Sequence, residues 1–206
     1  MKKVLIITYY WPPSGGPGVQ RIVKFCKYLP QFGWEPTILT VKNGEYPAMD
    51  KSFIDEISHI PVESAKGFSF FALFKLLTGK KKVSSHQMSS KEGETFFSKL
   101  TRWIRIHMII PDGRIGWDWA AVAKGQKMIE TNQFDLIFST SPPHTVHLIG
   151  KSLAQKSGIP WVCDFRDPWT DRFYYQENPR NALISFLDSH LEKSVLRKCN
   201  HLTVVS

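Results

Sequence analysis

Residues 4–21 read VLIITYYWPPSGGPGVQR, and this stretch decides how the rest of the chain is interpreted. Its first five residues are a short, mostly β-branched apolar run, which is typical of a strand buried on both faces of a sheet. A turn rich in glycine and proline follows, and apolar residues then recur at helical spacing at Val19, Ile22, Val23, Cys26 and Leu29. The stretch therefore predicts a strand, a tight turn and a helix.

The glycine-rich turn is a candidate anion site. The first N–H groups of a helix have no partner within the helix, and the helix dipole is positive at this end. Gly15, Gly16 and Arg21 are thus candidates for contacting a phosphate or carboxylate, with Tyr10 beside them as a stacking face. The sequence matches neither the dinucleotide-binding glycine pattern nor the Walker loop, so a plain tight turn with packed aromatic residues is the alternative.

Composition limits the classes of function. The 206 residues fit one large domain or one lobe of a larger protein, and 27 Lys and Arg against 18 Asp and Glu give a net charge of +9. This excess favours an acidic partner such as a membrane surface, a phosphorylated ligand or nucleic acid. The basic residues are scattered along the chain, so no nucleic acid is expected. The three cysteines are far apart, which predicts reduced thiols in a cytosolic protein and no disulfide framework.

Strand and helix patterns alternate along most of the chain. The first helix should end near Leu29, because Pro30 and Gly33 follow. Strands are predicted at 34–41, 60–62, 135–140, 160–165 and 201–206, and helices at 117–130, 145–156 and 183–195. Such alternation predicts an α/β fold with a Rossmann-like, doubly wound, mostly parallel sheet.

A helical insertion is expected around residues 66–116. Its first part, 68–77, is densely apolar and precedes the lysines at 80–82, so it could lie in a membrane interface or pack as an ordinary helix. A polar loop at 84–93 and a second helix at 96–110 follow. No stretch has the 18 or more apolar residues that a membrane span needs, so we expect any membrane contact to be peripheral.

Three polar turns follow predicted strands, at 14–21, 140–144 and 164–169. Parallel strands bring their carboxyl ends to one edge, where ligands bind in such sheets. Asp164, Arg166 and Asp167 could orient a hydroxyl or phosphate and accept a proton, or could form a structural ion pair with Trp169 capping the core. His144 could hydrogen-bond a ligand or cap a helix. No third ligand accompanies His144 and His147 in sequence, so no metal site is expected.

The order and spacing of these motifs resemble a known family. The stretches 4–16, 34–40, 141–144, 164–169 and 203–206 are together similar to the amino-terminal half of family 4 glycosyltransferases of the GT-B fold. This resemblance covers nearly the whole chain, and residues 66–116 are its least typical part. It implies that residues 1–206 form a single acceptor-binding lobe, and that the carboxy-terminal lobe, which binds the nucleotide sugar, is absent from this chain.

The resemblance also implies an activity. It is a retaining transfer, without metal or cofactor, from a nucleotide sugar to a sugar or lipid-linked acceptor, such as a cell-surface polysaccharide. The loop at Gly15 and Gly16 would face the donor diphosphate or the acceptor, and Asp167, Arg166 and His144 would handle the acceptor. Many relatives carry a histidine near the position of Arg166, which this chain lacks. The enzyme is expected in the cytoplasm, peripheral at the inner, anionic face of the cell membrane. The alternative is a stand-alone binding module for a nucleotide or phosphorylated ligand.

Overall fold

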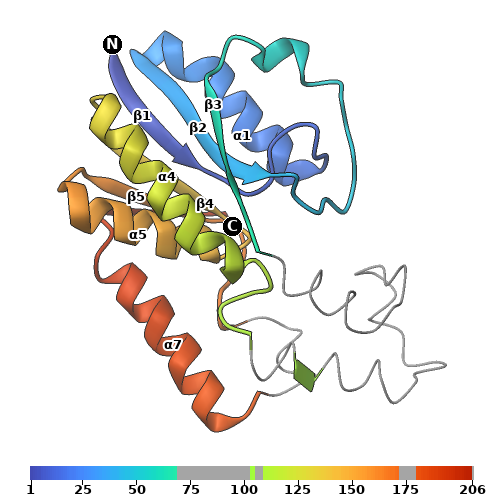
Figure 1. Ribbon diagram of the computed structural model, residues 1–206, viewed down its shortest axis with the longest axis vertical. Helices are drawn as coiled ribbons and strands as arrows, with labels where there is room; N and C mark the ends of the chain where they lie inside the picture. Colours follow the sequence, from blue (N-terminus) through green and yellow to red (C-terminus); the bar gives the residue numbers. More distant parts are fainter. Residues whose placement is uncertain (69–102, 105–108, 172–179, 206) are drawn as a thin grey trace.

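The computed structural model describes residues 1–68, 103–104, 109–171 and 180–205. Its six strands form one sheet in the order β3-β2-β1-β4-β5-β6, and every neighbouring pair is parallel (Figure 1). The expected Rossmann-like, doubly wound α/β fold is therefore confirmed. The strands are β1 (Lys2–Ile7), β2 (Trp34–Lys42), β3 (Val62–Lys66), β4 (Leu136–Ser141), β5 (Trp161–Phe165) and β6 (His201–Val204).

Helices cover the two faces of this sheet. They are α1 (Pro17–Tyr28), α4 (Asp118–Thr131), α5 (Thr145–Ser157) and α7 (Ala182–Leu196), with short 3₁₀ turns η1 (Leu29–Phe32), η2 (Asp55–Ile57) and η4 (Ile115–Trp117). In Figure 1, α4 and α5 lie on one face and α1 on the other. All four helices agree with the sequence-based prediction to within a few residues.

The alternation of side chains along β1 produces the two cores. Leu5 and Ile7 belong to the core under α4 and α5, whereas Val4 and Ile6 belong to the core under α1. All four side chains are buried, as expected for a central strand of a parallel sheet.

The third strand was predicted in the wrong place. It runs over Val62–Lys66 rather than 60–62, and it pairs with β2 at the edge of the sheet. Of its five residues only Ala65 is buried. An edge strand of this kind needs no apolar run, so its polar sequence gives no strand pattern, while Ile60 is buried in the preceding turn.

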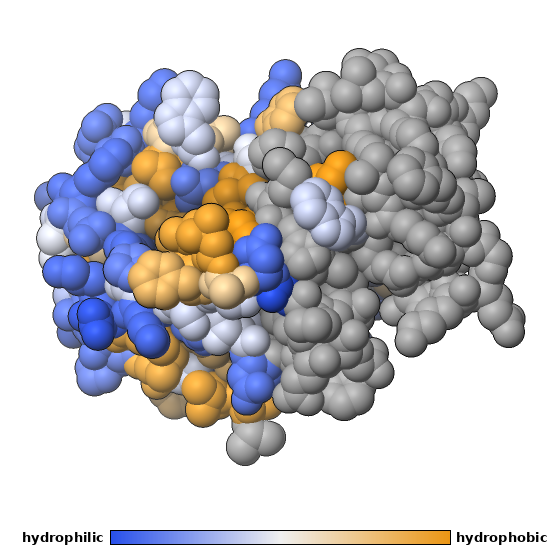
Figure 2. Space-filling view, turned by 90° about the horizontal axis from the view of Figure 1, so that it is seen from below, coloured by the Kyte–Doolittle hydropathy of each residue, from blue (hydrophilic) through white to orange (hydrophobic). Residues whose placement is uncertain are grey.

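Helix α7 is present as predicted, but its apolar residues are not all turned inward. Leu183 and Phe186 are two-thirds exposed, and the buried residues of the helix are Asp188 and Val195. Figure 2 views the molecule from below Figure 1, where the lower end of α7 lies. On this face, apolar side chains are exposed among hydrophilic ones. Polar contacts described below attach this helix to the domain.

The expected insertion begins and ends side by side. The N–H of Phe68 donates to the carbonyl of Gly116 at 3.0 Å, so the segment returns to the point where it left. The helices predicted at 68–77 and 96–110 fall largely outside the described residues. Within the described part of the chain, no helix is long and apolar enough to cross a membrane.

Candidate functional site

The strand order reverses between β1 and β4, which places a topological switch point there. Ligands of open α/β sheets bind beyond the carboxyl ends of the strands at such a point. The turns after β1, β4 and β5 meet at this edge, as predicted from the sequence. Hydrogen bonds of Asp164 and Arg166 hold these three turns together.

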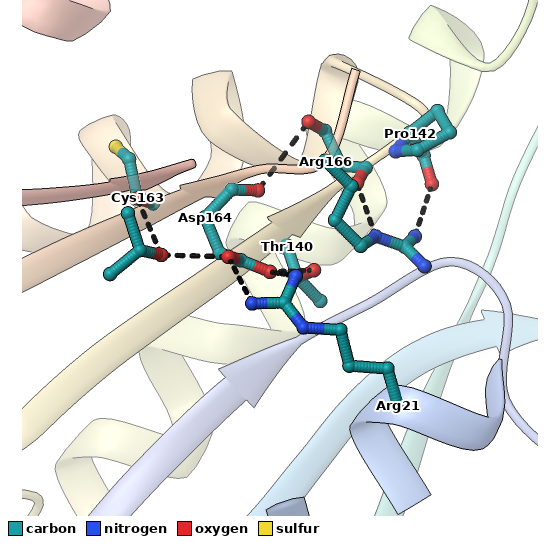
Figure 3. A network of polar contacts seen from close by, with 8 residues as sticks. Arg21, Thr140, Pro142, Cys163, Asp164 and Arg166 are labelled. Carbon is teal, nitrogen blue, oxygen red and sulfur yellow. Dashed lines mark hydrogen bonds and ion pairs between the residues drawn. The ribbon is translucent and has the colours of Figure 1, made fainter. Parts of the chain in front are cut away.

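Asp164, on β5, is the centre of a buried polar cluster (Figure 3). Its carboxylate accepts hydrogen bonds from Thr140 Oγ1 on β4 and Thr203 Oγ1 on β6, both at 2.7 Å. It also accepts two from Arg21 of α1, from Nη1 and Nη2, both at 3.0 Å. Asp164 is 1% exposed, and its carboxylate joins β5 to β4, β6 and α1.

The ion pair of this edge therefore joins Asp164 to Arg21, and it does not join Asp164 to Arg166. The Asp164 side chain is 2% exposed and that of Arg21 29% exposed. A two-pronged pair of this kind fixes the guanidinium plane as well as the charge. It holds α1 against β5 at a fixed position, which agrees with the structural alternative for Asp164.

Arg166 lies across the start of α1. Its Nε donates to the carbonyl of Ser141 at 2.5 Å and its Nη2 to that of Pro142 at 3.3 Å. A Cβ added to Gly18 would lie only 1.7 Å from Nη1 of Arg166. Gly18 is therefore the residue that lets this guanidinium approach the helix backbone, a role that the sequence pattern did not indicate.

Arg166 is partly buried and lies among the charges of Asp164, Asp167 and Arg21. Burial lowers the pKa of Arg166 from its usual value, and the carboxylates of Asp164 and Asp167 oppose that shift. The guanidinium also faces the helix end where the dipole is positive. An anion at this place would lower the electrostatic energy of both groups.

The glycine turn is held by a segment that sequence reasoning missed. The N–H of Gly15 donates to the carbonyl of Ala48 at 3.0 Å, and Ser14 forms a bridge with Met49. Gly16 has φ 112°, a left-handed conformation that favours glycine. The turn is thus fixed on one side by residues 48–50 and on the other by α1.

The remaining predicted side chains differ in their access to solvent. Asp167 is exposed and makes no hydrogen bond or ion pair with the described residues. Tyr10 is half-buried between the edges of Tyr9 and Tyr46, while Tyr9 and Trp11 are buried. The packing interpretation therefore holds for Tyr9 and Trp11, and only Tyr10 keeps a partly accessible ring.

His144 is buried rather than exposed to the edge. It is 1% exposed and stacks on Trp169 with ring centroids 4.9 Å apart. Its side chain makes no capping hydrogen bond to α5. Instead Asp112, at the end of the insertion, accepts from Thr145 N at 2.9 Å and from Thr145 Oγ1 at 2.8 Å. This carboxylate occupies the α5 end, and no local pattern in the sequence predicts it.

A second buried network lies beneath the site. Ser139 Oγ accepts a hydrogen bond from Trp161 Nε1 at 2.8 Å and lies 2.8 Å from His147 Nδ1. The Ser139 hydroxyl thus links the Trp161 indole to the His147 ring. Burial, followed by the charge of Arg166, lowers the pKa of His147 to about 3. No cluster of three His, Cys, Asp or Glu side chains in the described ranges could hold a metal ion.

Comparison with known proteins gives matches in structure only. No protein-family model and no curated protein sequence matches the chain. Sucrose-phosphate synthase from Thermosynechococcus elongatus matches with a TM-score of 0.59 at 11% identity, over 100% of this chain and 43% of that one. MurG from Acinetobacter baumannii matches all of this chain and 41% of its own, with a TM-score of 0.48 at 12% identity. The glycosyltransferase SnogD from Streptomyces nogalater matches all of this chain and 43% of its own, with a TM-score of 0.46 at 12% identity.

The likeness to the synthase, at 11% identity, is one of fold alone. The chain thus has the fold of a GT-B lobe, which confirms the fold that the sequence resemblance implied. It spans about two fifths of the length of the solved structures that it matches.

Proposed function

We propose that this chain is the acceptor-binding lobe of a retaining glycosyltransferase. The enzyme would move a sugar from a nucleotide sugar to a lipid-linked or cell-surface polysaccharide acceptor. The observation that carries the proposal is the position of Arg166, which lies over the start of α1 at the switch point of a GT-B-like lobe. The other half of the cleft, which binds the donor, would belong to a second lobe.

The chemistry needs stabilisation of a leaving diphosphate. Backbone N–H groups in the turn at Gly15 and Gly16, the positive end of α1 and the Arg166 guanidinium would face the negative charge that develops on the departing oxygen. Arg166 is held by two carbonyls, so it needs little reorganisation during the reaction. No step in this account needs a metal ion or a cofactor.

The acceptor would be handled by Asp167. This carboxylate is exposed next to Arg166 and makes no hydrogen bond with the described residues, so it is available to accept a proton from an acceptor hydroxyl. Tyr10 would offer a stacking face to the sugar. Arg21 and Asp164 would act by holding α1 in register with β5, and His144 by supporting the loop through Trp169.

The partners follow from this assignment. They are a nucleotide sugar bound mainly by the second lobe, a sugar or lipid-linked acceptor, and the anionic inner surface of the cell membrane, where the enzyme would be peripheral. The net charge of +9 supports the membrane surface as a partner.

Flotation with vesicles that contain an anionic lipid tests the membrane contact, with Lys80, Lys81 and Lys82 changed to Gln as the matched variant. Binding that is absent, or unchanged in the variant, would remove the membrane part.

Sugar transfer tests the function itself. The whole product of the gene is offered a panel of nucleotide sugars with a lipid extract as acceptor, beside Asp167→Asn and Asp171→Asn. Asp171 is a second exposed carboxylate, four residues away. We expect transfer that falls 100-fold or more in the first variant, about the size of a general-base contribution, and stays unchanged in the second.

The same experiment examines the alternative of a stand-alone binding module. That alternative is favoured by the fact that Arg166, Arg21 and the α1 terminus all lie within this chain. No transfer to any acceptor, together with tight binding of a nucleoside diphosphate by residues 1–206, would replace the transferase proposal with the binding module.

A further inference from the structure

Two side chains at the returning end of the insertion each contact one side of the candidate site. They are Asp112 and Arg114, and the N–H of Arg114 donates to Asp112 Oδ1 at 2.9 Å. The η4 turn that follows holds this segment, because Trp117 is buried and its N–H donates to the carbonyl of Arg114 at 2.9 Å. The two side chains therefore extend from one fixed turn.

Asp112 holds the side of the site that carries Arg166. Its carboxylate accepts from Thr145 N at 2.9 Å and from Thr145 Oγ1 at 2.8 Å, and Thr145 is fully buried. Thr145 begins α5 directly after the turn at 141–144, and carbonyls of this turn accept from Arg166. A carboxylate at this place pairs with a free helix N–H and opposes the positive end of the dipole. It therefore fixes where α5 and the turn before it lie.

Arg114 holds the side that carries the glycine turn. Its Nη1 donates to Glu45 Oε2 at 2.9 Å, and its Nη2 donates to the Glu45 carbonyl at 3.2 Å. The guanidinium also lies over the Tyr9 ring, 5.0 Å from its centroid. Glu45 lies three residues before Ala48, whose carbonyl accepts from the N–H of Gly15 at 3.0 Å. Arg114 thus fixes the loop against which the glycine turn rests.

We propose that Asp112 and Arg114 are positioning residues for the sugar transfer proposed above, an inference that rests on that function. One fixes the turn that holds Arg166, the other fixes the loop that holds the glycine turn, and the hydrogen bond between them sets the separation of the two. The leaving diphosphate would lie between Arg166 and the glycine turn. A displacement of about 1 Å in their separation is enough to lower the rate steeply.

The first test is a double-mutant cycle in kcat, measured on the whole gene product at saturating nucleotide sugar. We expect Arg114→Met to lower kcat about tenfold or more by misplacing the groups around the diphosphate. In an Arg166→Met background the same change should lower kcat by less than about twofold, because the group that Arg114 positions is gone. A loss of activity through unfolding would instead be equal in the two backgrounds.

Lys124→Met is the matched control. It breaks an ion pair with Glu63, at 2.7 Å, that joins α4 to the edge strand β3. Because this pair is half-exposed and holds neither turn of the site, kcat should stay within about twofold of the native value.

Hydrogen exchange read by mass spectrometry tests the same contacts without sugar transfer. Arg114→Met should speed the exchange of the peptide that contains the Gly15 N–H several-fold, and Lys124→Met should not. Asp112→Asn, whose amide oxygen can replace only one of the two carboxylate oxygens, should speed exchange at Thr145 and the start of α5.

Unchanged exchange in Arg114→Met would overturn the proposal whatever the kinetics show. Faster exchange with a native kcat, or equal losses of kcat in the two backgrounds, would also overturn it, because the contacts would then serve stability alone. Failure of the proposed function is a separate result, in which the native protein transfers no sugar. The exchange rates still decide whether these two residues hold the turns of the site.

Discussion

The guanidinium of Arg21 meets the carboxylate of Asp164 with both of its terminal nitrogens, at Nη1–Oδ2 and Nη2–Oδ1 distances of 3.0 Å. The two residues are 143 positions apart in sequence. The first helix is thereby joined to the fifth strand at the edge where the three predicted turns meet. Removing either partner leaves a charge whose solvation is incomplete.

We expect Asp164→Asn and Arg21→Met each to lower the free energy of unfolding by about 2 kcal/mol, because each removes a charge-assisted pair from a mostly buried place. The double variant should lose at least about 1 kcal/mol less than the sum of the two. Urea unfolding of the four proteins measures this coupling. Strictly additive losses would mean that the pair does not contribute to the stability of the edge.

Gly18→Ala should have an effect that depends on Arg166. In the native background the new Cβ would meet Nη1 of Arg166 and displace a guanidinium that two carbonyls hold, so stability should fall by roughly 1 kcal/mol. In an Arg166→Ala background the clash is absent and alanine is the better helix former, so the same change should be neutral or stabilising by up to about 1 kcal/mol. Thermal unfolding of the four proteins measures the change in stability that Gly18→Ala causes in each background. Equal changes in the two backgrounds would disprove the contact.

The buried His147 predicts a pH dependence of stability. Its pKa is about 3 in the folded chain and 6.5 in an unfolded one, so below pH 6.5 the unfolded state binds the additional proton. Its contribution to stability is therefore complete above about pH 6.5 and is lost as the pH falls toward 3, with a slope approaching 1.4 kcal/mol per pH unit. His147→Asn can keep a hydrogen bond with Ser139 without titrating, so the difference in unfolding free energy between the two proteins should shrink as the pH falls. A constant difference from pH 7 to 5 would contradict this assignment.

Helix α7 should be held by Asp188 rather than by its exposed apolar residues. Asp188 accepts from Trp169 Nε1 at 2.8 Å and forms an ion pair with Arg180, and both charged side chains are nearly buried. Asp188→Ala would remove the acceptor of the Trp169 indole and the ion-pair partner of Arg180 together, at a cost of about 3 kcal/mol in unfolding free energy. Phe186→Ser, on the same helix and 67% exposed, should change stability by less than about 0.5 kcal/mol. Chemical unfolding compares the two, and similar losses would show that the apolar residues anchor the helix.

The repeating apolar pattern made most of the fold predictable. The runs at β1, β4 and β5 and the helical spacing after Gly18 are local signals, and parallel pairing follows from their alternation. The edge strand β3 carries no such signal, because only Ala65 of its five residues is buried. Its position was therefore predicted wrongly.

The site was predictable at the level of turns but not of contacts. Placing Arg21, Asp164 and Arg166 at one edge needed only the rule that parallel strands end together. The pairing of Arg21 with Asp164, the carboxylate of Asp112 at the start of α5 and the approach of Arg166 to Gly18 join distant segments. Nothing in the local sequence selects these partners over others of the same charge.

The rate of sugar transfer by the whole gene product carrying Arg166→Met, measured at saturating nucleotide sugar, tests the central claim most directly. Lys24→Met, which removes a more exposed cation from helix α1, is the matched control. If Arg166 stabilises the leaving diphosphate, kcat should fall about 100-fold or more while the control stays within about twofold of the native rate. A native kcat in a folded Arg166→Met enzyme would contradict the account, because the carboxyl edge of this lobe would then not be where the charge of the reaction is stabilised.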